Sequence, residues 1–190
     1  MAKRIICIGD SNTYGYDPAA FGGARYPDGV RWTSRLGSAW DIQNLGENGR
    51  EIPSSSFAVR VLLSQIRSRL PADGLCLMLG TNDLLCGVSP AETARRMEGF
   101  LDRMRDCDLP LLLVAPPLMQ RGAWVESEAL LENARALAPL YRELAERCGA
   151  FFCDTAAWDI PVVFDGVHFS EDGHRRFAKQ MQRVFQTVFR

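Results

Sequence analysis

Ser11 is the residue of this chain whose type and position best fit nucleophilic chemistry. It follows the apolar residues 5–8 and the turn Gly9-Asp10. A lone serine in such a place more often caps a helix or closes a turn, so its meaning depends on the rest of the chain. A serine hydroxyl also needs a base to accept its proton before it can attack a carbonyl carbon. The chain offers only two histidines for this, His168 and His174.

His168 is the better candidate base because a carboxylate precedes it at a useful spacing. Asp165 lies three residues earlier, so its carboxylate and the imidazole can share one turn, and Asp165 can then fix the tautomer of the ring. His174 lies in a predicted helix beside two arginines, and we expect it to be solvent-exposed. Ser11, Asp165 and His168 are therefore candidate catalytic residues. The alternative is that Asp165-Gly166 forms an ordinary turn before a helix that Ser170 caps.

Two further loops could supply hydrogen-bond donors to a developing oxyanion, which acyl transfer requires. The segment 44–49 contains Gly46, whose backbone N–H is one candidate donor. The segment 80–83 contains Asn82, whose side-chain amide is another. Asn, Gly and Asp are ordinary loop residues, so these segments gain meaning only together with Ser11 and His168.

The elements that must position these residues follow an alternating pattern. Apolar runs of strand length are each followed by turn residues and then by a helical pattern, which is typical of a parallel sheet with helices on both faces. In such sheets, ligand sites lie at the carboxyl ends of the strands, where Ser11 and both loops fall. Pro139 is expected to kink or split its helix. The predicted strands are residues 4–8, 40–45, 74–79, 109–115 and 150–153.

Irregular segments at residues 17–30, 116–126 and 155–167 follow strand ends, so we expect them to surround the same site. Aromatic residues in or near them could line an apolar wall or anchor the loops. The candidate substrate-binding residues are Asn12, Tyr14, Trp124 and Trp158.

Composition narrows the class of protein. A chain of 190 residues is long enough for one domain, which we place at 1–190. The net charge of -1 is spread without blocks of one sign, which argues against a nucleic-acid groove or a membrane patch and favours a small-molecule partner. The six cysteines show no C-x-x-C spacing, as expected for reduced thiols in a cytoplasmic protein. No motif indicates a phosphate-binding loop or a zinc site, so we expect no cofactor and no metal.

Taken together and in order, the motifs resemble those of a known family. Gly9-Asp10-Ser11, Gly46 in an N-x-G context, Gly80-x-Asn82-Asp83 and Asp165-x-x-His168 resemble the four sequence blocks of the GDSL, or SGNH, hydrolases. The resemblance spans almost the whole chain. Within the family, the chain looks most like the small bacterial arylesterase and acyltransferase group.

The resemblance implies an α/β fold, a three-layer α/β/α sandwich around a central, mainly five-stranded parallel sheet of flavodoxin-like type. It implies that Ser11 is the nucleophile, that His168 is the general base and that Asp165 orients it. The oxyanion hole would comprise the backbone N–H groups of Ser11 and Gly46 and the side chain of Asn82. Asn12 departs from the pattern, because the motif has leucine there; we expect altered packing or pocket polarity and an intact mechanism.

The expected function is that of a serine esterase which cleaves small, short-acyl carboxylic esters through an acyl-enzyme and can also transfer the acyl group to alcohols. One alternative is a carbohydrate O-acetyl esterase. A non-enzyme alternative is a catalytically silent ligand-binding protein of the same fold. The partner is expected to be a small-molecule ester, with homo-oligomerisation left open.

Overall fold

Five parallel strands form the centre of the protein. The computed structural model describes residues 2–190 and, apart from residue 106, their side chains. The strand order is β2-β1-β3-β4-β5, the flavodoxin-like order, as predicted from the resemblance. The strands are β1 (Lys3–Gly9), β2 (Trp40–Gly46), β3 (Gly74–Met78), β4 (Leu111–Ala115) and β5 (Phe151–Asp154).

Helices connect the strands. Serine side chains cap the longer ones: Ser89, for example, accepts a hydrogen bond from the Glu92 N–H at 3.2 Å at the start of α4. None of the helices within residues 2–190 has the length and hydrophobicity that crossing a bilayer requires. The helices are α1 (Ser11–Tyr14), α2 (Ser56–Arg67), α3 (Thr81–Leu85), α4 (Pro90–Met104), α5 (Glu128–Cys148) and α6 (Glu171–Val188), with short 3-10 segments η1 (Phe21–Gly23), η2 (Trp32–Ser34), η3 (Arg105–Cys107) and η4 (Ala156–Trp158).

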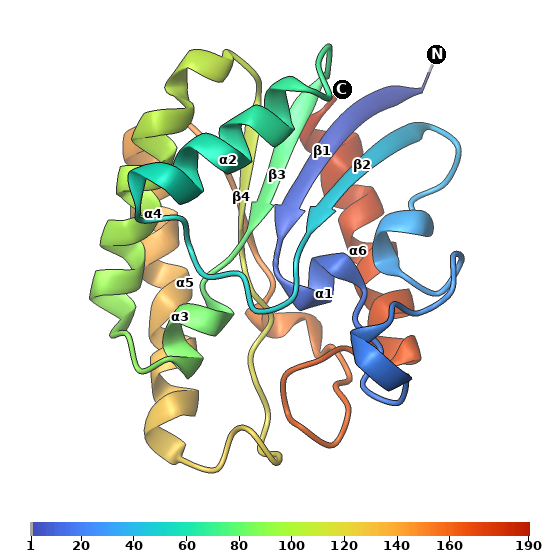
Figure 1. Ribbon diagram of the computed structural model, residues 1–190, viewed down its shortest axis with the longest axis vertical. Helices are drawn as coiled ribbons and strands as arrows, with labels where there is room; N and C mark the ends of the chain where they lie inside the picture. Colours follow the sequence, from blue (N-terminus) through green and yellow to red (C-terminus); the bar gives the residue numbers. More distant parts are fainter. Residues whose placement is uncertain (1) are drawn as a thin grey trace.

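The sheet is covered on both faces, which confirms the predicted three-layer sandwich (Figure 1). Alternate strand residues point to opposite faces. Ile6 and Ile8 of β1 pack in one apolar cluster with α2, α4 and α5, whereas Ile5 and Cys7 pack in a second cluster with α6. Both faces of the strands are buried, and accordingly β1 from Ile5 onward and the whole of β3 contain only apolar residues and glycine.

The sequence predicts that Pro139 kinks or splits its helix, and the structure contradicts the split. The α5 helix runs unbroken from Glu128 to Cys148 with Pro139 inside it. Proline removes one internal hydrogen bond. The neighbouring residues Leu137, Ala138 and Tyr141 are buried, and Pro139 itself is exposed. Packing on both sides of the proline therefore holds the helix together.

The carboxyl ends of the strands meet at one edge, where α1, α3 and two long loops converge (Figure 1). The loops 116–126 and 155–167 are joined by hydrogen bonds from Gln120 N to Gly166 O at 2.9 Å and from Trp124 N to Asp165 O at 3.0 Å. Gly166 has a φ of +85°, and a Cβ atom there would collide with the Gln120 carbonyl. Glycine therefore allows the two loops to meet next to Asp165.

Candidate active site

The first turn after β1 presents the Ser11 hydroxyl. Asp10 caps α1 and accepts a hydrogen bond from the Asn12 N–H at 2.9 Å. Burial raises the pKa of Asp10 to about 6, and hydrogen bonds from backbone N–H groups and the charge of His168 oppose that rise. Among the residues that the structure describes, no acceptor engages the Ser11 N–H, so this donor is available beside the hydroxyl.

A chain of hydrogen bonds joins Ser11, His168 and Asp165. The Ser11 Oγ lies 2.9 Å from His168 Nε2, and His168 Nδ1 lies 2.7 Å from Asp165 Oδ2. A carboxylate can only accept, so the proton of the neutral imidazole resides on Nδ1 and Nε2 can accept from the serine hydroxyl. The structure therefore brings the three predicted residues together in a geometry suited to proton transfer.

The Asp165 carboxylate is itself held in place. Its Oδ1 accepts hydrogen bonds from the backbone N–H groups of Val167 at 2.8 Å and His168 at 2.9 Å. All three side chains of the Ser11, His168 and Asp165 chain are buried. Since each Asp165 oxygen has a fixed donor, the orientation of the His168 ring is fixed through it.

Two aromatic rings flank the imidazole. The ring centroids of Tyr16 and Trp124 lie 4.7 Å and 5.0 Å from that of His168, and Trp124 is 54% exposed. The Tyr14 ring instead lies beneath the Arg25 guanidinium, 4.1 Å from it. The structure thus brings Trp124 next to His168, and of the two neighbouring tyrosines it is Tyr16 that contacts the imidazole. No sequence signal separates these two tyrosines, which lie in one turn.

Two other candidate substrate-binding residues are engaged elsewhere. The Trp158 ring packs against Phe177 at 5.3 Å, in the layer formed by α6. Asn12 is buried, and its side chain bonds the backbone on both sides of His168. Both side chains are thus engaged within the protein, and their role in substrate binding stays a prediction.

Asn82 lies at the start of α3, where it can act as a donor. Its Nδ2 donates to the Arg50 carbonyl at 3.0 Å, which uses one of two amide hydrogens. Gly80 precedes the helix with a φ of +124°, and a Cβ atom there would crowd the Tyr141 hydroxyl. The buried Asp83 ties α3 to the neighbouring loop by accepting from the Ile52 N–H at 3.0 Å.

The Gly46 N–H, the predicted oxyanion donor, has a partner within the protein. It donates to the Asn44 side chain at 2.8 Å, so this donor is already engaged. A Cβ atom at position 46 would collide with the backbone of Tyr14, which shows why glycine is needed where β2 meets α1. Within the described residues, the N–H of Gly49 has no acceptor, and the adjacent Arg50 carbonyl contacts Asn82. The spacing N-x-G-x-x-G contains both glycines, and spacing alone could not choose between them.

The prediction that His174 is solvent-exposed is wrong. The residue is buried against the rings of Tyr26 and Phe169, and its Nδ1 accepts a hydrogen bond from the Trp32 N–H at 3.3 Å. Its Nε2 has no partner among the described residues. Burial, aided by the positive charge of Arg31, lowers the pKa of His174 to about 3. His174 is therefore a neutral core residue.

His174 should make folding stability depend on pH. Because its pKa falls from 6.5 to about 3 on folding, the stability that neutral His174 contributes is present above pH 6.5 and is lost as the pH falls toward 3. Asp10 has a pKa raised to about 6 in the folded protein, so it takes up its proton more readily there than in the unfolded chain. Its protonation therefore raises the free energy of unfolding as the pH falls from about 6 toward 3.8. Comparing the wild type with His174→Gln isolates the histidine, since Asp10 is present in both.

We compare the free energy of unfolding of the wild type with that of His174→Gln. The difference between the two should fall by up to about 1.4 kcal/mol for each pH unit below pH 6.5. Urea unfolding at several pH values measures this difference. A difference that stays constant with pH would show that His174 takes up a proton in the folded state as easily as in the unfolded chain.

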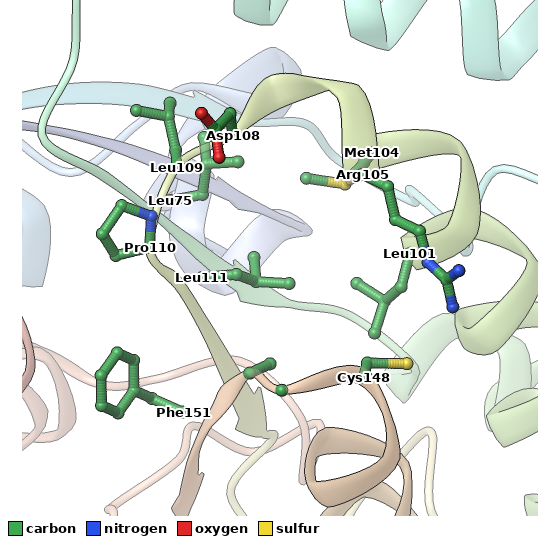
Figure 2. A pocket seen from close by; sticks show the side chains of 12 residues that line it. Leu75, Leu101, Met104, Arg105, Asp108, Leu109, Pro110, Leu111, Cys148 and Phe151 are labelled. Carbon is green, nitrogen blue, oxygen red and sulfur yellow. The ribbon is translucent and has the colours of Figure 1, made fainter.

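One exposed thiol and one cavity lie outside the hydrogen-bond chain of Ser11, His168 and Asp165. Cys86 is exposed, and its thiol pKa is raised, first by desolvation and then by Glu51, which disfavours a thiolate nucleophile. Within the described part of the chain, no cluster of three His, Cys, Asp or Glu side chains could hold a metal ion. A cavity of about 450 Å³ is lined by residues that include Leu75, Leu111 and Phe151 (Figure 2). These three lie at the amino ends of β3, β4 and β5, whereas Ser11 follows the carboxyl end of β1.

Comparisons with known proteins agree with the fold and the motifs. Residues 7–176 match the model of the GDSL-like lipase/acylhydrolase family, and the chain belongs to this family. The chain is similar to the solved structure of Est24, a carbohydrate acetylesterase from Sinorhizobium meliloti, with 25% identity, a TM-score of 0.86, and coverage of 98% of this chain and 100% of that one. It is equally similar to an aryl esterase of M. smegmatis, with 25% identity, a TM-score of 0.86 and the same coverage. A comparison with curated proteins gives no match.

The family and the solved neighbours establish the class of activity. The protein is an esterase or acylhydrolase of the GDSL family.

Proposed function

We propose that the protein is a serine esterase that cleaves small carboxylic esters through an acyl-enzyme on Ser11. The observation that carries this proposal is the hydrogen-bond chain from Ser11 Oγ to His168 Nε2 at 2.9 Å and from His168 Nδ1 to Asp165 Oδ2 at 2.7 Å. A hydroxyl, a base and an orienting carboxylate in this order are the components of a catalytic triad.

In the proposed first step, Ser11 Oγ attacks the carbonyl carbon of the ester while its proton passes to His168 Nε2. Asp165 accepts the Nδ1–H bond and stabilises the imidazolium that forms. The tetrahedral intermediate collapses, and the leaving alcohol takes the proton back from His168. Water or an alcohol then attacks the acyl-enzyme by the same proton route, which releases an acid or a new ester and restores Ser11.

The oxyanion of each tetrahedral intermediate needs donors close to Ser11. We assign the backbone N–H of Ser11, the second amide hydrogen of Asn82 and the N–H of Gly49 to this role. The Gly49 assignment replaces that of Gly46, because the Gly46 N–H is bound to Asn44 whereas that of Gly49 has no acceptor among the described residues.

The surroundings of His168 support a small, partly apolar substrate. Tyr16 and Trp124 lie within 5.0 Å of the imidazole centroid to centroid, which restricts the space beside the nucleophile and favours short acyl groups. A carbohydrate acetyl ester is the second candidate, because Est24 is a carbohydrate acetylesterase. Against it, the Arg50 side chain that could bind a sugar is engaged with the Gly9 carbonyl at 3.2 Å and with Glu47.

The test mixes the purified protein with p-nitrophenyl acetate and measures the rate and the products of the reaction. The rates on p-nitrophenyl octanoate and on acetylated xylose are measured in parallel. An acyl-enzyme predicts that an added alcohol yields its acetate ester at the expense of acetic acid. If hydrolysis proceeds at high alcohol concentration and no acetate ester of the alcohol forms, the result contradicts an acyl-enzyme that alcohols can attack. Faster turnover of acetylated xylose than of the aryl acetate would favour the carbohydrate alternative.

Replacing Asn82 with alanine should lower kcat by about 10²–10³-fold with little change in KM. The amide is expected to bond the oxyanion more strongly than the ground-state carbonyl, so its loss acts on the transition state. Steady-state kinetics on p-nitrophenyl acetate separate the two constants, and circular dichroism checks the fold. A change confined to KM would instead assign Asn82 to substrate binding.

A further inference from the structure

The residue after the nucleophile does not follow the motif that names the family, and the structure gives it a specific set of contacts. The Asn12 Nδ2 donates to the Val167 carbonyl at 3.1 Å, and its Oδ1 accepts from the Phe169 N–H at 2.9 Å. These two residues flank His168. One side chain therefore bonds the backbone on both sides of the imidazole.

From this arrangement we propose that Asn12 is a positioning residue that holds His168 in register with Ser11. The inference rests on the proposed role of His168 as general base. It concerns a residue that does not touch the substrate and acts through the placement of the base.

Asn12 is itself rigidly held, as a positioning residue must be. Its N–H donates to Asp10 at 2.9 Å, and its carbonyl accepts the indole N–H of Trp32 at 3.0 Å. The residue is only 6% exposed, so water does not compete freely for its amide. The helical turn that carries Ser11 and the segment that carries His168 are thereby joined directly.

We call the two hydrogen bonds of the Asn12 side chain, to the Val167 carbonyl and from the Phe169 N–H, the clamp. Only an amide of this length can form both bonds. The contact with Val167 requires a donor and the contact with Phe169 requires an acceptor, and both must come from one side chain. The leucine of the family motif would fill a similar volume and bond neither group. An aspartate would keep the acceptor, lose the donor while ionised, and add a negative charge beside the His168 segment.

Accurate placement matters here because the serine and the imidazole meet through a single hydrogen bond. Asp165 fixes the rotation of the His168 ring and also bonds the backbone N–H groups of Val167 and His168. Asn12 adds bonds to the Val167 carbonyl and the Phe169 N–H, and so ties this backbone to the turn that carries Ser11. A displacement of the base by about 1 Å can lower a rate by about 10²-fold. Loss of the clamp should therefore appear in kcat and in the ionisation of the base.

The experiment compares Asn12→Leu and Asn12→Asp with Thr155→Val as a matched control. Thr155 is buried, and its hydroxyl donates to the Ala115 carbonyl at 2.7 Å, so the control also loses one buried hydrogen bond. Each variant is measured for kcat and KM on p-nitrophenyl acetate, for the pH profile of kcat/KM, and for the downfield proton resonance of the Asp165–His168 hydrogen bond in the resting enzyme.

We expect Asn12→Leu to lower kcat by about 10- to 100-fold, to change KM by less than about threefold, and to broaden the downfield resonance. We expect Asn12→Asp to move the acidic limb of the pH profile to higher pH, since a nearby negative charge favours the imidazolium. Thr155→Val should change neither the profile nor the resonance.

The proposal is overturned if folded Asn12→Leu keeps kcat within about twofold of the wild type, or if it raises KM alone. Should Asn12→Leu fail to fold, kcat of Asn12→Asp decides, because this variant loses the donor to Val167, and a kcat within about twofold of the wild type, measured at a pH above the acidic limb, overturns the proposal. The resonance is observed without substrate, so it reports on the clamp independently of catalysis. It would still do so if Ser11→Ala remained active and thereby refuted the proposed function.

Discussion

Replacing Ser11 with alanine should lower kcat for ester hydrolysis by about 10⁶-fold and leave the fold intact. The serine hydroxyl is the attacking group in the proposed mechanism, and its side chain makes a single hydrogen bond, to His168 at 2.9 Å. Removing the Ser11 hydroxyl should therefore abolish the attack on the ester and disturb the packing of the protein only slightly. Hydrolysis of p-nitrophenyl acetate and the thermal unfolding midpoint measure the two effects.

Ser54→Ala is the matched control for this variant, because Ser54 is exposed and lies outside the site. It should behave like the wild type in both measurements. If Ser11→Ala retains more than about a tenth of the wild-type rate on several esters, Ser11 is not the nucleophile.

Replacing Asp165 with asparagine should lower kcat by about 10⁴-fold, the cost of the same change in a serine protease with this arrangement. Asp165 accepts three N–H bonds, from the His168 ring and from the backbone of Val167 and His168. An amide has one oxygen for these donors, and its NH₂ group favours the tautomer with the proton on Nε2. That tautomer cannot accept the Ser11 proton.

Asp159→Asn provides the control, since this exposed carboxylate lies in the same loop and has only a 3.7 Å ion pair with Arg176. Its kcat should match that of the wild type. A mild effect of Asp165→Asn on kcat, with the fold preserved, would show that His168 does not depend on the carboxylate for its tautomer.

The arrangement of the sheet could be predicted from the sequence because its determinants are local. Buried parallel strands need continuous apolar runs, and the predicted run at 74–79 differs from β3 (Gly74–Met78) by one residue. Likewise, Asp165 and His168 are close in the chain, so their pairing follows from one turn. By contrast, the contact between Ser11 and His168 joins residues 157 positions apart, and its prediction depends on the resemblance to the family.

The prediction for His174 fails because it rests on the neighbouring arginines and leaves out the position of the histidine around the helix. The adjacent arginines suggested an exposed face. Yet His174 precedes Phe177, Met181 and Phe185 at spacings of 3, 7 and 11 residues, which is the buried face of α6. Periodicity, applied to the histidine as to its apolar neighbours, would have placed it in the core.

The roles of Asn12 and Gly46 could not be read from the sequence, because they depend on contacts between distant segments. Asn12 bonds residues 155 and 157 positions away, and Gly46 is required by the approach of Tyr14. Residue type and spacing indicate which groups can donate or accept. They do not indicate which of these groups are already engaged.

The most direct measurement is to locate the site of covalent modification by diethyl p-nitrophenyl phosphate, an ester analogue that phosphorylates activated serines. Peptide mass spectrometry of the inactivated protein identifies the modified residue. We predict one phosphoryl group per chain on the peptide that contains Ser11, formed slowly or not at all in Asp165→Asn. An adduct on Cys86, or loss of activity with Ser11 unmodified, would contradict the assignment of Ser11 as the nucleophile.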